Sequence, residues 1–166
     1  MKRTITALTL AAAVFAVAPK SADAQASITA TAEVAGALTV TAGNDLDFQI
    51  VVPGFTKAVA VSDATAGTFS LSGGAGSEVA LSFTSLPANL SDGTNNLPIT
   101  YAGVHNTTAD PSAGATAFTP SAGATTNLSG LGELFIYLGG TVDATGSPPA
   151  GTYTGTVTLS AAYTGN

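Results

Sequence analysis

Near its C-terminus the chain reads GTYTGTVTLSAAY over residues 151–163, and this stretch decides the fold class. Apolar residues or glycine occupy every second position from Tyr153 to Tyr163, and Thr or Ser fills most positions between them. A period of two places one set of side chains on a buried face and the other on a solvated face, as in an antiparallel sheet. The stretch therefore predicts a β-strand over residues 152–163.

Similar short segments, separated by Gly, Pro, Asn, Asp and Ser, fill the chain after residue 26, and none has the period and caps of a helix. The segments that we expect to form strands are 28–42, 46–52, 57–62, 67–72, 78–84, 97–102, 115–119, 133–144 and 152–163. Such spacing predicts an all-β, antiparallel fold, best matched by an immunoglobulin-like β-sandwich. Residues 103–131 contain the hexapeptide PSAGAT twice and predict a long irregular loop with at most one short strand.

The N-terminal 24 residues have the pattern of a cleavable signal peptide. Lys2 and Arg3 precede an apolar run of 15 residues, and small residues then fit cleavage after Ala24 or after Ala26. The run is shorter than the ~20 residues of a membrane-spanning helix. We therefore expect export through the periplasm to the cell surface or the medium, with no membrane span in the mature chain.

The composition excludes several classes of function. The chain has no Cys, one His, four basic and ten acidic residues, and removal of residues 1–24 leaves one Lys against nine acids, a net charge of 1 − 9 = −8. Binding to a nucleic-acid backbone needs many Lys or Arg residues, so nucleic acid is not an expected partner. We expect neither a cofactor, nor a metal site, nor an enzyme: His105 is interpreted as a solvated loop residue, and Asp45 and Asp47 as a turn that leads into a strand.

The first mature segment also has a period of two. Ile28, Ala30, Ala32 and Val34 share one face, and the alternation continues past Gly36 to residue 41. One strand over residues 27–41 would span roughly 50 Å, at about 3.3 Å per residue, whereas typical strands span ~17–20 Å. Two interpretations stay open. Either the strand bends from one sheet into the other, or residues 25–36 form a detachable extension that completes the sheet of a neighbour by β-augmentation, while residues 37–166 form the sandwich domain.

Two motifs carry a resemblance to a known family. LDFQIVVPG (residues 46–54) and LGGTV (138–142) followed by PAGTYTGTV (149–157) resemble the opening and closing patterns of the secreted bacterial family "domain of unknown function 4402". Gln49 stands where the opening pattern commonly has Gly. The family is similar in layout to spore-coat-U-type proteins and to chaperone–usher pilins, although the Cys pair of many pilins is absent.

The resemblance implies a structural or adhesive surface subunit that assembles into a pilus-like (fimbrial) fibre by donor-strand complementation. Its partners would be other copies, other surface subunits and a periplasmic chaperone. The implied donor residues are Ile28, Ala30, Ala32 and Val34, and those of the acceptor groove are Tyr153, Val157, Leu159 and Tyr163. The alternative is a self-complete extracellular sandwich that binds a ligand through its 103–131 loop.

Overall fold

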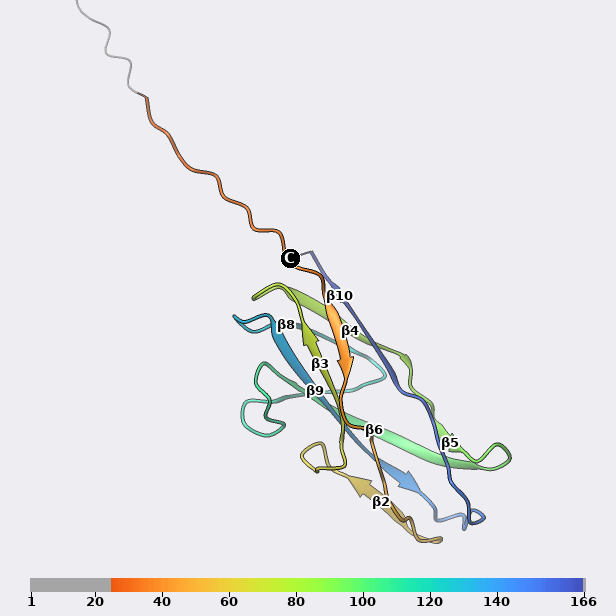
Figure 1. The fold of residues 1–166 in the computed structure, drawn as a ribbon. Coiled ribbons are helices and arrows are strands. Elements are labelled where there is room, and N and C mark those ends of the chain that lie inside the picture. Colours follow the sequence, from red (N-terminus) through yellow and green to blue (C-terminus); the bar gives the residue numbers. More distant parts are fainter. Residues whose placement is uncertain (1–24, 166) are drawn as a thin grey trace, which may run out of the picture. The chain divides into compact units, whose positions relative to one another are not determined.

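The computed structural model describes residues 25–165, which belong to two separate units, 25–32 and 33–165. Every residue from 25 to 37 is solvent-exposed and lies outside any strand. The expected signal peptide, residues 1–24, lies outside the described residues. Over residues 33–165 the fold is an all-β sandwich of antiparallel strands, which confirms the predicted fold class (Figure 1).

The larger sheet is built around two long neighbouring strands, β9 (Glu133–Asp143) and β6 (Asn96–Asn106). The other edge of β9 pairs with β3 (Gly67–Ser72) over its first half and with β2 (Thr56–Val59) over its second half, and β1 (Thr39–Ala42) pairs with β3. The edge of β6 that faces away from β9 pairs with β5 (Asn89–Ser91) and with β7 (Thr116–Phe118).

The smaller sheet has the order β10-β4-β8 among the described residues. Its strands are β4 (Glu78–Ser85), β8 (Ala124–Asn127) and β10 (Thr158–Tyr163). Leu81 of β4 and Leu159 of β10 pack with Leu71, Leu134 and Ile136 of the larger sheet, so the two sheets enclose one apolar core here. A second apolar cluster lies toward the far end of β9, and its buried residues are Phe48, Val59, Ala66, Leu97, Ile99, Val142 and Ala144.

The alternation of apolar residues in β9 explains its central position. Leu134, Ile136, Leu138 and Val142 point into the core and are at most 1% exposed. Gly140 takes the remaining inward position because a Cβ atom there would lie 2.4 Å from the Thr100 carbonyl oxygen of β6. The glycine therefore permits close pairing of the two longest strands.

The structure corrects several strand predictions. The expected strand 28–42 is reduced to β1, the expected strand 152–163 is reduced to β10, and residues 46–52 form no strand. The strand β7 lies within the predicted strand 115–119, and the expected loop 103–131 also contains the end of β6 and the strand β8. The strand β5 was not predicted. Within the part of the chain that the structure describes, there is no helix with the length and apolar character to cross a membrane.

Candidate functional site: an apolar groove

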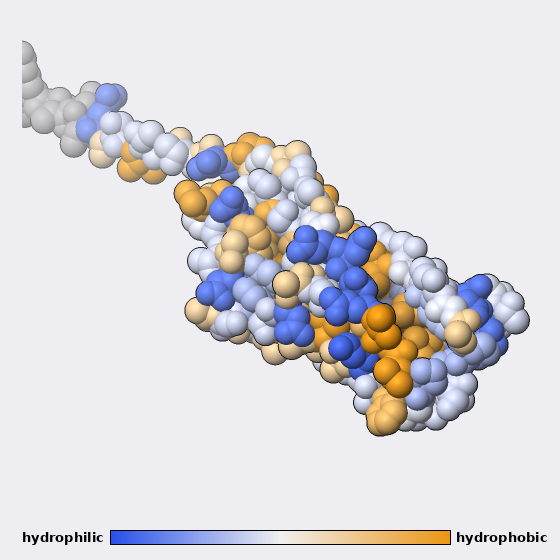
Figure 2. Space-filling model, turned by 60° about the horizontal axis from the view of Figure 1, so that its bottom comes forward, coloured by the Kyte–Doolittle hydropathy of each residue, from blue (hydrophilic) through white to orange (hydrophobic). Residues whose placement is uncertain are grey.

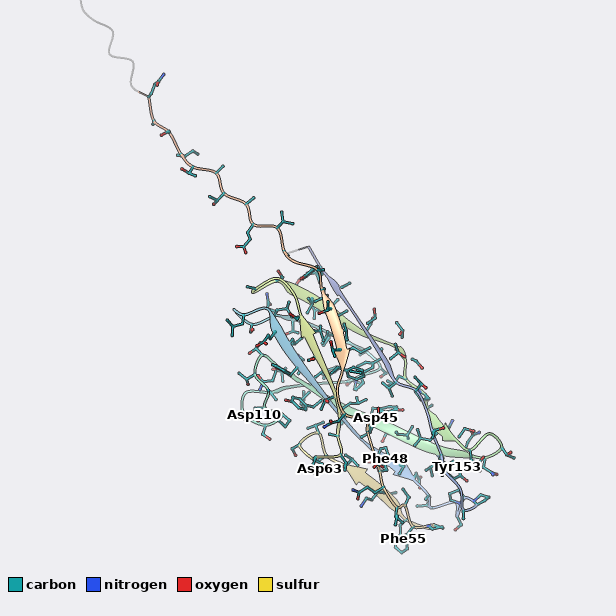
Figure 3. All side chains as sticks on the ribbon, in the orientation of Figure 1. Asp45, Phe48, Phe55, Asp63, Asp110 and Tyr153 are labelled. Carbon is teal, nitrogen blue, oxygen red and sulfur yellow. The ribbon has the colours of Figure 1, made fainter. Side chains whose placement is uncertain are left out.

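An open groove of about 880 Å³ lies between residues 44–53 and 148–157. Both segments are irregular in the structure, although the sequence predicts strands over residues 46–52 and 152–163. Figure 3 shows Phe48 on one bordering segment and Tyr153 on the other. Among the described residues, no backbone hydrogen bond joins the two segments. The sandwich therefore has a gap at this seam, and apolar side chains line it.

The first border, residues 44–53, is held to the domain by a few hydrogen bonds. The Asp47 N–H donates to the Thr65 carbonyl (2.9 Å), and Phe48 is 7% exposed within the second core cluster. Gln49 has φ +55°, and its N–H donates to the Asp47 Oδ1 atom at 2.7 Å. This local turn interrupts the extended backbone and explains why the predicted strand 46–52 does not form.

The second border, residues 148–157, bends at residues 150 and 151 and is then paired on one side through a bridge at Thr154. Thr154 and Ser91 exchange two backbone hydrogen bonds of 2.8 and 2.9 Å. In an extended segment the N–H and C=O groups of neighbouring residues point to opposite edges, so those of Tyr153 and Gly155 point away from Ser91 and toward the groove. By the same alternation Val157 continues this edge. The border therefore presents a row of backbone donors and acceptors to any chain that enters.

Side chains of the larger sheet form the floor. They are the inward-facing Leu97, Ile99 and Tyr101 of β6 and Leu138 and Val142 of β9. The Tyr101 hydroxyl oxygen is buried without a hydrogen-bond partner among the described residues, and burial raises the pKa of this phenol. An unsatisfied buried hydroxyl costs about 1–3 kcal/mol. The floor is thus apolar, with one polar atom that lacks a partner.

The first border runs along β9 in the direction of that strand. A Cβ atom on Gly67, which pairs with Leu138, would lie 3.2 Å from the Leu46 side chain. Eight residues later, the Gly54 N–H donates to the Ala144 carbonyl just beyond the end of β9.

The second border runs in the opposite direction. Thr154 bonds to Ser91, which pairs with Asn96 at the start of β6, beside the end of β9. At the far end of β10, the Gly74 N–H donates to the Tyr163 hydroxyl at 2.6 Å, close to the turn that precedes β9. The two borders are therefore antiparallel, and a strand between them would be antiparallel to one border and parallel to the other.

The groove is closed at one end and open at the other. Near the start of β9, β1 and β10 come close to each other, and the Tyr163 hydroxyl donates to the Gly36 carbonyl (2.8 Å). At the opposite end the lining includes Pro53, Pro148 and Pro149, which lie outside the strands of the described residues. An extended chain in the groove must therefore leave past these prolines.

Carboxylates stand on the rim of the groove. Asp45 and Asp47 lie on the first border. Near the second border, the Asp92 carboxylate accepts hydrogen bonds from the Asn95 side chain and from the Asn95 and Thr94 N–H groups, which lower its pKa to about 2. Desolvation, and then the Asp92 charge, raise the pKa of Tyr153. The rim therefore favours a neutral or cationic occupant over an acidic one.

The candidate site residues fall into three groups. Tyr153 and Val157 line the groove, but Leu159 does not, because it is buried between β4 and the larger sheet. Tyr163 also lies outside the lining and instead fastens residue 36 to the turn at residue 74. The four candidate donor residues, Ile28, Ala30, Ala32 and Val34, are all exposed, Ile28 and Val34 by 96% and 92%.

Sequence analysis did not assign the groove floor or the first border to the site. The inward positions of the predicted strand 97–102 and the apolar residues of 46–52 carried the necessary signal, but nothing in the pattern paired them with residues 148–157.

The interpretation of His105 as a solvated loop residue is corrected. His105 is a buried residue of β6 that packs against the Phe118 ring (5.8 Å), and burial lowers its pKa. The described residues hold no group of three or more His, Asp or Glu side chains placed to bind a metal ion.

A family model, "Domain of unknown function (DUF4402)", matches residues 26–163. The chain belongs to the DUF4402 family. No curated protein matches the sequence. Gln49 occupies the left-handed region of backbone conformation, which Gly would enter without strain.

Proposed function

We propose that this DUF4402 protein is an exported structural subunit of the cell surface that assembles by strand donation: residues 27–35 of one copy fill the apolar groove of another. The observation that carries the proposal is the unfilled groove between residues 44–53 and 148–157. A sandwich that leaves such a seam open exposes apolar surface and a row of unpaired backbone groups. A strand from a second copy would cover both.

The extension has the properties that the groove requires. Residues 27–34 and the border 150–157 have eight residues each and would both span about 26 Å as strands. The extension is apolar on one face, and Glu33 is its single charged residue, so it brings little negative charge to the acidic rim. It lies outside any strand of the described structure, so its backbone groups are available for pairing.

The alternation of side chains along both segments is also consistent with this pairing. The groove-facing N–H and C=O groups belong to residues 153, 155 and 157, whose side chains face the interior. Directly opposite residues of paired strands share one face, so the inward donor residues Ile28, Ala30, Ala32 and Val34 would stand opposite these positions. Thr29, Thr31 and Glu33 would then face solvent together with Thr152, Thr154 and Thr156.

The absence of Cys from the sequence permits a direct test by disulfide formation. Thr31→Cys is combined, in separate variants of the full chain, with Thr152→Cys, Thr154→Cys or Thr156→Cys. Directly opposite residues bring their Cα atoms to about 4.5–5.5 Å, within the range of a disulfide. We expect at least one combination to give a ladder of covalent oligomers on a non-reducing denaturing gel.

The matched control is Ala30→Cys with Thr156→Cys, whose side chains would lie on opposite faces and should not link. Equal ladders from the control and the test pairs would contradict strand pairing. A disulfide formed only within single chains would also overturn the proposal, because the protein would then be a self-complete sandwich.

The binding module with ligand contacts in residues 103–131 receives less support. Two strands occupy part of this segment, and the buried Asn106 Nδ2 atom donates to the carbonyls of Asp110 (2.7 Å) and Ala113 (2.8 Å). These bonds hold the connection between β6 and β7 in one conformation. We therefore assign this connection a structural role in the proposal.

A further inference from the structure

Outside the extension, the largest exposed apolar side chains lie at the two ends of β9. Val52 and Phe55, which are 56% and 67% exposed, lie near the open end of the groove, and Ile50, 84% exposed, lines it. Leu131, 84% exposed, lies in the turn that precedes β9. Figure 2 shows apolar side chains grouped at the end of the domain to which β2 belongs, and Figure 3 places Phe55 there. We call these regions the β2 end and the Leu131 end.

Lys57 at the β2 end and Glu133 at the Leu131 end carry opposite charges, and the β2 end also holds the exposed Asp143 carboxylate, on the residue that pairs with Thr56. Lys57, the one Lys or Arg among residues 25–165, is exposed on β2, two residues after Phe55. Glu133 is exposed at the start of β9, two residues after Leu131. Lys57 of one copy and Glu133 of the next would therefore attract each other across a contact between the two ends.

We propose that the β2 end of one copy docks on the Leu131 end of the copy that donates its strand to it. The inference rests on the proposed function, and the short connection between the donor strand and its own domain carries it. A donor strand must leave the groove at its open end, beside Pro53 and Pro148. Only Ala35, Gly36 and Ala37 separate Val34 from Leu38, the first half-buried residue of the domain, and three residues span about 10 Å.

The donor copy therefore presents the surface around residue 36 to the open end of the groove. Hydrogen bonds place this surface at the Leu131 end: the Tyr163 hydroxyl joins Gly36 to Gly74, and the Gly73 N–H donates to the Gly132 carbonyl (2.9 Å). The short connection thus brings Leu131 of one copy to the apolar end of the next. The contact is heterologous, and its repetition gives an open head-to-tail chain of subunits.

A disulfide between Phe55→Cys and Leu131→Cys tests the contact in the full chain. Within one copy the two positions lie near opposite ends of β9, whose 11 residues span about 36 Å, so only two copies can form this bond. We expect covalent oligomers on a non-reducing gel. Phe55→Cys with Ser82→Cys, an exposed position in the middle of β4, is the matched control and should remain monomeric.

A charge exchange gives a second readout that does not depend on oxidation. Lys57→Glu should raise the concentration for half-assembly in sedimentation velocity about tenfold, and addition of Glu133→Lys should restore it. Lys57→Glu with Ser82→Lys and Thr84→Lys, two exposed positions of β4, has the same net charge as the rescued variant and should not recover.

The outcomes separate the two proposals. Disulfides between residue 31 and the groove border without links between residues 55 and 131, or a failed charge exchange, would overturn the end contact and leave strand donation intact. Links between residues 55 and 131 without those to the groove border would overturn strand donation instead. Absence of both kinds of link would overturn both proposals.

Discussion

Gln49 offers the sharpest test of how the first border of the groove is built. Its backbone has φ +55°, a left-handed conformation that side chains with a Cβ atom adopt at a cost of about 1–2 kcal/mol. The hydrogen bond from its N–H to the Asp47 carboxylate helps to hold this conformation. Gln49→Gly removes the steric penalty and keeps the backbone hydrogen bond.

The expected gain is smaller than the steric penalty. Gly also increases the conformational freedom of the unfolded chain, which lowers stability by about 0.5–1 kcal/mol. The difference predicts that Gln49→Gly raises the free energy of unfolding by about 0.5–1 kcal/mol. For a domain of this size the melting temperature should rise by about 2–4 °C.

The assay is urea denaturation of the monomeric protein, at concentrations where sedimentation shows no assembly. Gln49→Ala is the matched control: it shortens the exposed side chain but keeps the Cβ atom, so the free energy of unfolding should not change. Gln49→Val adds a β-branch in the left-handed region and should lower stability by about 1 kcal/mol or more. The reasoning is refuted if Gln49→Ala stabilises as much as Gln49→Gly, or if Gln49→Gly destabilises the protein.

Three further predictions concern single polar groups. Tyr101→Phe should raise the free energy of unfolding of the monomer by about 1 kcal/mol in urea, because the buried hydroxyl then no longer lacks a partner, and a decrease would reveal such a partner. Asp92 has a folded pKa of about 2, below its ordinary value of 3.8, so its stabilisation is complete above pH 3.8 and is lost as the pH falls through about 2. Acid titration followed by circular dichroism should show a weaker dependence over this range for Asp92→Asn, and an unchanged dependence would contradict the role of its carboxylate. Burial lowers the pKa of His105 below 6.5, so stability should decrease as the pH falls from 6.5 through the lower folded pKa. In thermal melts between pH 4.5 and 7.5, His105→Gln should reduce this slope, and an equal slope would assign it to other groups.

Segments with strong alternation and a buried face could be predicted from the sequence, because their own side chains determine their position. β3, β4 and β9 lie within one residue of the predicted ranges. β8 has the sequence ATTN, with little apolar surface, and was predicted as loop. β8 forms because it pairs with β4. Pairing with a strand that is distant in the sequence cannot be predicted from the pattern of four residues.

Polar residues of the 103–131 segment were misjudged for a related reason. His105 and Asn106 follow Gly103 and precede a run of small residues, so the sequence suggests solvent. In the structure β6 continues through both, since its edge pairs with β9 up to Asn106 and Phe118 covers the His105 ring. β6 extends to Asn106 because β9 provides a pairing partner as far as Phe135. The sequence around residue 106 does not reveal this distant partner.

Three segments that were predicted as strands form none, although their alternation is strong. Residues 27–35, 46–52 and 152–157 alternate as strands do, yet none forms a strand in the described structure apart from the single bridge at Thr154. Natural sequences usually agree with their local structure, and disagreements concentrate at functional sites. Here the three segments are the proposed donor and the two borders of the groove. Under the proposed strand donation, residues 27–35 and 152–157 would gain their strand partners from another copy, whereas the turn at Gln49 accounts for residues 46–52.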